Sequence, residues 1–156
     1  MTRGILPRLV AACGAGAASL LLCLPRADAS PPPLPPPVIS EPFTVLPCHP
    51  ATTLGSEGCA EHDLLAADRR IDQEVRVLFG LLHGDAARAR LATAESAWLA
   101  YRRADCSSQS DAYAGGSFAP VAFALCEVHD DADRSADLRR FYRALVEGRS
   151  RPPAFP

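Results

Sequence analysis

Histidines and cysteines are the residues with which this chain could hold a metal ion. Cys59 and His62 have the spacing of a ligand pair, and His83 and His129 could contribute further nitrogens. Structural zinc sites usually rest on a paired Cys-x-x-Cys, and the sequence contains none. We therefore predict no metal site and no cofactor.

A nucleophilic serine is the second candidate, because Ser117 directly follows Gly115 and Gly116. A nucleophile elbow needs a glycine two residues after the serine, between a strand and a helix. Ala119 occupies that position, and no strand pattern is evident nearby. We therefore interpret Ser117 as the cap of a helix.

Carboxylates could act as a general acid and base. Glu95 and Asp105 are about 15 Å apart if both lie on one helix, which exceeds the carboxyl separation of glycosidases. Asp130, Asp131 and Asp133 lack the ligand series and the glycine of a calcium loop, so a solvated helix face is the better interpretation. Since no group of residues supports catalysis, we do not expect an enzyme.

A cluster of large side chains remains. Trp98, Tyr101 and Arg102 share a helix face at i, i+3 and i+4, with Cys106 one turn further. We favour a core role, in which Trp98 packs between helices and Arg102 pairs with an acid such as Asp68. The alternative is a binding hot spot, in which Trp, Tyr and Arg are enriched.

Two helices joined by a short link must position these residues. The first is expected over about residues 61–82, and its apolar face comprises Leu64, Ile71, Val75, Leu78 and Leu82. Asp68 falls on the same stripe, so its charge must be paired or lie at the edge. The second is expected from a cap at Asp85 to about Asp105. The link of about three residues predicts that they pack antiparallel as a hairpin.

A third helix is expected to start at Ser117, with Pro120 in its first turn, where proline is tolerated. Its apolar face continues to Leu145 but is interrupted by the acids at 130–133. Either one long helix has a solvated middle, or a break near His129 divides it. The fold class is therefore all-α, a small antiparallel three-helix bundle, and residues 43–147 form its domain.

Residues 1–29 have the pattern of a cleavable signal peptide. Arg3 and Arg8 precede an apolar run from residue 9 to residue 24, and Ala27-Asp28-Ala29 gives a small-x-small cleavage site. The run is shorter than the ~20 residues of a bilayer span, and no lipidation pattern ends it, so no stable membrane anchor is expected. The protein is predicted to be periplasmic or secreted.

Export leaves four cysteines, which are Cys48, Cys59, Cys106 and Cys126. In an oxidising compartment they should form two disulfides. We favour the sequential pairing, Cys48 with Cys59 and Cys106 with Cys126, while a crossed pairing through Cys59 and Cys106 stays open. Residues 30–42 form a proline-rich spacer, and residues 148–156 a flexible tail that should fray.

Charge narrows the choice of partner. The full chain has 16 arginines and 18 acids, and residues 1–29 contain three of these arginines and one acid, so the exported part has a net charge of −4. No basic surface results, so nucleic acid is not an expected partner. A cationic protein partner is compatible with this charge.

The cysteines and helix motifs together resemble the LprI-type lysozyme inhibitor family of small exported bacterial proteins. The residues that carry the resemblance are Cys48, Cys59, Leu64 and Asp68, then Trp98, Arg102 and Cys106, then Tyr113, Gly115, Gly116 and Ser117, and finally Cys126 and Arg134. The resemblance implies a helical, disulfide-bonded binding protein outside the cytoplasm, and one branch is associated with inhibition of lysozyme. Asp111 and Tyr113, in the loop expected over residues 107–119, are then our candidate contacts with lysozyme or another envelope protein. The alternative is an envelope structural or stress-related adaptor without enzymatic activity.

Overall fold

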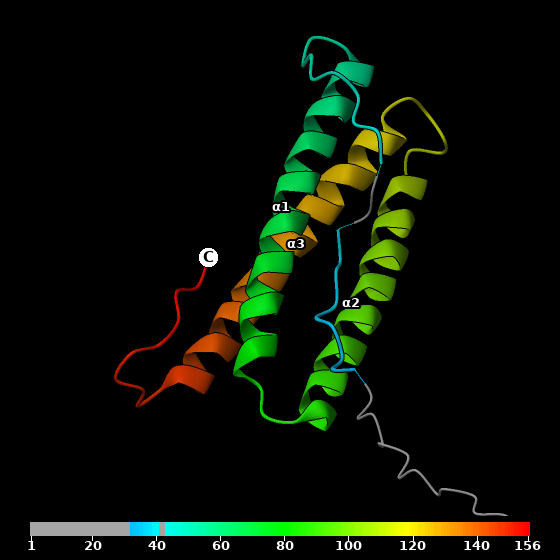
Figure 1. Ribbon diagram of the computed structural model, residues 1–156. Coiled ribbons are helices and arrows are strands. Elements are labelled where there is room, and N and C mark those ends of the chain that lie inside the picture. Colours follow the sequence, from blue (N-terminus) through cyan, green and yellow to red (C-terminus); the bar gives the residue numbers. More distant parts are fainter. Residues whose placement is uncertain (1–31, 41–42) are drawn as a thin grey trace, which may run out of the picture. The chain divides into compact units, whose positions relative to one another are not determined.

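Three helices make up the secondary structure of the part of the chain described in this computed structural model, residues 32–40 and 43–156. They are α1 (Thr53–Leu81), α2 (Asp85–Asp111) and α3 (Ala119–Val146), and these residues contain no strand (Figure 1). The predicted all-α class is confirmed. The predicted signal peptide lies outside the described residues, and none of the described helices is long and apolar enough to cross a membrane.

Helix α3 holds the bundle together, because it packs against both α1 and α2. Helices α1 and α2 run antiparallel, joined by residues 82–84, as the short link predicted (Figure 1). Their backbones approach each other at few points, because each helix packs mainly on α3. The predicted antiparallel hairpin is therefore open, and side chains such as Arg102 and Asp68 connect its two helices.

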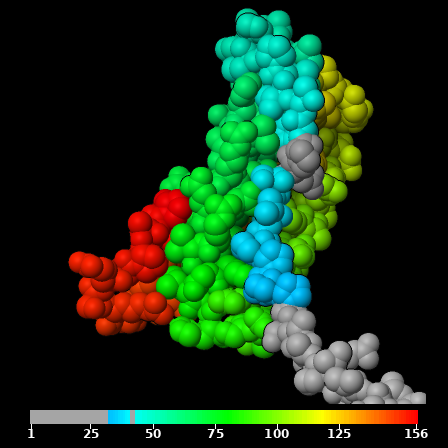
Figure 2. Space-filling model, viewed as in Figure 1, coloured from blue at the N-terminus to red at the C-terminus, as the bar shows by residue number. Residues whose placement is uncertain are grey.

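The segment that precedes α1 packs beside the splayed helices. Ile39 is 1% exposed and belongs to one apolar cluster with Ile71 of α1, Leu91 of α2 and Leu138 of α3. Its backbone N–H donates a hydrogen bond of 2.6 Å to Oδ1 of Asp72. Figure 2 shows this blue segment lying against the green surface of the helices. Although residue 39 falls in the predicted spacer, its side chain contributes to the core.

The apolar core confirms most of the stripe predicted for the first helix. Leu64, Ile71, Val75 and Leu78 are buried, and each such side chain contributes about 1.5–3 kcal/mol on leaving water. Partly buried residues that surround this core are Leu82, Trp98, Leu99, Tyr142, Leu145 and Phe155.

Helix α1 begins earlier than its apolar pattern indicated. Thr52 caps it, accepting a hydrogen bond of 3.0 Å from the N–H of Gly55, so residues 53–60, before the predicted start at about 61, are also helical. Gly55 and Gly58 do not break this helix. A Cβ on Gly58 would lie 2.5 Å from the carbonyl oxygen of Pro47, so these glycines instead let residues 46–49 cross the helix closely.

Substituting Gly58 by alanine tests this role. We expect Gly58→Ala to lower the free energy of unfolding by about 1–3 kcal/mol, because the added methyl group meets backbone atoms. Gly80→Ala is the matched control, since it lies in the same helix with nothing within 4 Å of an added Cβ, and it should stabilise by up to about 1 kcal/mol. Urea unfolding with intact disulfides measures both, and equal effects would contradict the close-crossing interpretation.

The helix caps differ from those predicted. The N-cap of α2 is Gly84, with φ of 82°, and Asp85 is the first helical residue, paired with Arg88 at 3.8 Å. The N-cap of α3 is Phe118, which makes no side-chain cap bond, so the prediction that Ser117 caps this helix is wrong. Helix α2 also extends to Asp111, because its polar last turns face solvent without any helix-breaking residue.

Helix α3 is continuous through His129, which excludes the predicted alternative of a break. After it, the chain folds back on the helix. The ring of Phe155 stacks on that of Tyr142 with centroids 4.4 Å apart, and the Tyr142 hydroxyl donates a hydrogen bond to the carbonyl of Pro153. These contacts place the end of residues 148–156, the segment predicted to be a flexible tail, against α3.

The sequential disulfide pairing is confirmed. One bond joins Cys48 to Cys59, and the other joins Cys106 to Cys126. The second bond links the end of α2 to the start of α3, which lie at the same end of the bundle as the start of α1 (Figure 1). Each bond is expected to stabilise the fold by about 2–4 kcal/mol.

Candidate functional site

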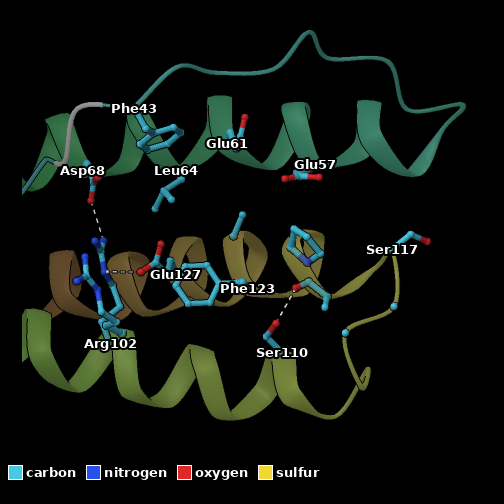
Figure 3. A pocket seen from close by; sticks show the side chains of 16 residues that line it. Phe43, Glu57, Glu61, Leu64, Asp68, Arg102, Ser110, Ser117, Phe123 and Glu127 are labelled. Carbon is cyan, nitrogen blue, oxygen red and sulfur yellow. Dashed lines mark hydrogen bonds and ion pairs between the residues drawn. The ribbon is translucent and has the colours of Figure 1, made fainter.

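Arg102 is buried at the point where the three helices meet. It is 3% exposed, and its Nη1 donates hydrogen bonds to Asp68 of α1 at 2.7 Å and to Asp131 of α3 at 2.5 Å. Its Nε lies 3.5 Å from Oε1 of Glu127, also on α3 (Figure 3). The predicted pairing of Arg102 with Asp68 is confirmed, and one guanidinium contacts carboxylates from two other helices.

The charge balance of this cluster is unequal, since three buried carboxylates contact one cation. Burial by itself lowers the pKa of Arg102, but its contacts with Asp68 and Asp131 outweigh burial and raise it. Burial raises the pKa of Asp131 to about 7, against the attraction of Arg102 and with the added repulsion of Asp68. The predicted solvated middle of the third helix is therefore wrong at Asp131, which is 1% exposed.

Trp98 and Arg134 extend the same buried polar structure. The Arg102 guanidinium lies 5.1 Å and that of Arg134 5.8 Å from the centre of a half-buried Trp98 ring. Arg134 also donates from Nε to Glu95 at 3.2 Å, and Glu95 is 1% exposed. Trp98 thus has the core role that we favoured. Tyr101 points outward and is 59% exposed.

Sequence reasoning missed two further buried acids on α1. Glu74 accepts a hydrogen bond of 2.7 Å from the Ser135 hydroxyl and pairs with Arg139 at 3.3 Å. The carboxylate of Asp72 accepts hydrogen bonds from the backbone N–H of Ile39 and from the hydroxyl of Ser40. A signal was present, since both acids lie next to apolar positions of the stripe, at 71 and 75.

The loop after α2 exposes the remaining motif residues. Gly115 has a φ of 73°, a conformation that side chains rarely adopt, and the N–H of Gly116 closes a turn onto the carbonyl of Tyr113 at 2.9 Å. The rings of Tyr113 and Phe118 lie 5.1 Å apart, and both are exposed, as are Asp111 and Ser117. The structure therefore separates a buried set of motif residues from an exposed set.

A pocket of about 710 Å³ opens beside this loop. Figure 3 shows it between α1 and α2, with α3 behind. The residues that line it include Phe43, Leu64 and Phe123, with Glu57 and Glu61 on α1, Asp68, Arg102 and Glu127 of the buried cluster, and Gly115, Gly116 and Ser117 of the loop. Family-motif residues that are far apart in sequence thus meet around one cavity.

Residues 32–40 and 43–156 contain no complete set of side-chain donor atoms for a metal ion. One group, Asp105, Cys106, Cys126 and Asp130, brings its donor atoms within 4.8 Å of one another. Its two sulfur atoms form a disulfide, which offers no thiolate, and so two carboxylates remain. Burial, followed by the charge of Asp105, raises the pKa of Asp130. The histidines predicted as weak ligand candidates, His62, His83 and His129, are all exposed.

These features define a disulfide-stapled three-helix protein whose helices are joined by a buried ionic cluster beside an exposed loop and a pocket. A family model described as Lysozyme inhibitor LprI matches residues 48–138. The chain belongs to this inhibitor family, as the resemblance predicted. Neither the search of curated proteins nor the search of solved structures gives a match.

Proposed function

We propose that this protein is an exported inhibitor of lysozyme-type muramidases and acts by binding them, without catalysis. The observation that carries the proposal is the family match, which extends over residues 48–138 and includes α1, α2 and most of α3. In the proposed exported form, which begins at Ser30, the net charge of −4 favours encounter with a cationic protein.

The exposed loop supplies the contact surface of this proposal. Tyr113, Phe118 and Leu125 are 47%, 43% and 48% exposed, and they line one shallow groove. Aromatic side chains held by a rigid scaffold give large contact area at low entropic cost. Asp111 is exposed at the end of α2 and precedes Ala112, which lines this groove. The Cys106–Cys126 disulfide links α2 and α3, the two helices that the loop connects.

The test is inhibition of several lysozymes by the oxidised protein from Ser30 to Pro156, at micromolar concentration. We expect loss of lysozyme activity, and we expect reduction of the disulfides to abolish the inhibition. Tyr113→Ala should weaken inhibition about tenfold, as expected for an aromatic hot spot contributing about 1.4 kcal/mol.

Tyr101→Ala is the matched control, because this tyrosine is also exposed but lies on the body of α2 away from the loop. It should leave inhibition unchanged. Full activity of every lysozyme tested in the presence of wild-type protein would refute the proposal, and the adaptor alternative would then stand.

A further inference from the structure

The pocket beside the loop has an apolar interior. Phe43, Leu64 and Phe123 project into it from the segment before α1, from α1 and from α3 (Figure 3). Its volume of about 710 Å³ lies in the range of clefts that bury most of a small ligand's surface. The pocket can therefore enclose an aliphatic or aromatic group.

Its charge is mainly negative. Four carboxylates line it, those of Glu57, Glu61, Asp68 and Glu127, against the two guanidinium groups of Arg102 and Arg103. Arg102 is already bound to Asp68 and to Asp131, and Asp131 does not line the pocket. An anionic ligand would meet this excess of carboxylates, whereas a cation would be attracted by them in partly dehydrated surroundings.

Glu57 and Glu61 are the acids best placed to receive that cation. They lie one turn apart on α1, and both are half-buried along the pocket wall. Oε2 of Glu61 accepts a hydrogen bond of 2.8 Å from the N–H of Leu46, which fixes the position of this carboxylate.

Arg102 also lines the pocket, but its guanidinium already contacts Asp68, Glu127 and Asp131. The carboxylates placed to receive a ligand cation are therefore the two on the pocket wall of α1.

We propose that this pocket binds an arginine or lysine side chain presented by a polypeptide partner. The aliphatic stem packs on Phe43, Leu64 and Phe123, as long basic side chains do along apolar surface. The charged head lies between Glu57 and Glu61. The proposal rests on the proposed function, since the partner is then the lysozyme-type muramidase and the pocket forms part of the inhibitory surface.

The first experiment measures binding to the pocket directly. The probe is a blocked pentapeptide with one arginine between alanines, titrated into the isotopically labelled exported protein and followed through the backbone amide signals of Gly115 and Gly116. We expect saturable shifts, and at least tenfold weaker binding when citrulline replaces the arginine. This comparison leaves the protein unchanged.

The second experiment uses the double variant Glu57→Gln/Glu61→Gln, which removes both charges and keeps an amide oxygen for the N–H of Leu46. It should bind the arginine peptide and inhibit lysozyme at least tenfold less well than the wild type. Asp133→Asn/Glu147→Gln is the control, since it also removes two negative charges, but from exposed positions outside the pocket. It should leave both properties unchanged.

The outcomes separate the two proposals. Inhibition by the wild type that the glutamine variant retains in full overturns the pocket proposal and leaves the proposed function intact. Charge-dependent peptide binding without inhibition of any lysozyme supports the pocket and overturns the function. Equal binding of the arginine and citrulline peptides, or no binding of either, overturns the pocket proposal.

Discussion

Replacing Arg102 by methionine is expected to lower the free energy of unfolding by about 3–5 kcal/mol, a typical cost of removing one partner of a buried ion pair. Methionine preserves the length of the side chain but leaves Asp68, Asp131 and Glu127 without the guanidinium that contacts all three. The contact with the Trp98 ring is lost as well. Urea denaturation of the oxidised protein at pH 7 measures the change.

Arg140→Met is the control for this substitution. Arg140 also forms an ion pair, with Asp137, but its side chain is 64% exposed. Its replacement should therefore lower the free energy of unfolding by at most about 1 kcal/mol. Adding Asp68→Asn and Asp131→Asn to the Arg102→Met variant should recover part of the lost stability, because the uncompensated charges are then removed. A cost for Arg102→Met no larger than that of Arg140→Met would show that the cluster does not hold the helices together.

The second large effect is a dependence of stability on pH that arises from Asp131. Its pKa is about 7 in the folded protein, raised mainly by burial, and about 4 in an unfolded chain. Between these values the folded protein keeps a proton that the unfolded chain has lost. The stabilisation from this group is therefore complete below pH 4 and is lost as the pH rises through 7.

Asp131→Asn should remove this dependence. The amide still offers an oxygen to Nη1 of Arg102, but it carries no charge at any pH. We expect the variant to match the wild type near pH 4, to exceed it increasingly up to about pH 7, and to keep a constant advantage above that pH. At about 1.4 kcal/mol per pKa unit, the upper bound of this gain is about 4 kcal/mol. Unfolding curves of both proteins from pH 4 to pH 8 give the difference.

Asp137→Asn serves as the control for the pH series, because Asp137 lies on the same helix but is exposed. Its difference from the wild type should be small and flat across the range. A flat difference for Asp131→Asn as well, or one that grows towards low pH, would contradict the assignment of a proton to Asp131.

The buried cluster could be predicted only in part from the sequence. Asp68 lies on the apolar stripe of its helix and Arg102 on the stripe of the next, so each needed a buried partner of opposite charge. Asp131 stands between two other acids, Asp130 and Asp133, and a run of acids is typical of a solvated face. Asp131 differs from these two acids because it pairs with Arg102, which lies on another helix. The spacing of residues along α3 alone cannot predict that pairing.

The early start of α1 was missed for a related reason. Gly55 and Gly58 usually indicate a loop, because glycine weakens a helix by about 1 kcal/mol relative to alanine. Here the compensating gain is tertiary, since residues 46–49 cross the helix where a Cβ would collide with them, next to the Cys48–Cys59 bond. The burial of Ile39 was missed in the same way, because its proline-rich surroundings are typical of a spacer, whereas it belongs to the apolar cluster to which all three helices contribute.

The exposed part of the candidate site was more predictable than the pocket. Gly115-Gly116 indicated a turn, and the structure places a positive φ at Gly115 and leaves Tyr113 exposed beside it. The pocket depends on how far α1 and α2 diverge around α3 and on the path of the chain at Phe43. Neither the divergence of these helices nor the path of the chain at Phe43 can be predicted from the spacing of residues along one helix.

The packing of α1 on α3 rather than on α2 has a consequence for the route by which the chain acquires this structure. A bundle whose neighbours in sequence pack on each other can start from a local pair of helices. In this protein the main contacts of α1 are with a helix that follows the whole of α2, so a longer loop must close before much apolar surface is buried. Since folding slows as contacting residues lie farther apart along the chain, this domain belongs among the slower helical bundles, and stopped-flow refolding with intact disulfides measures its rate.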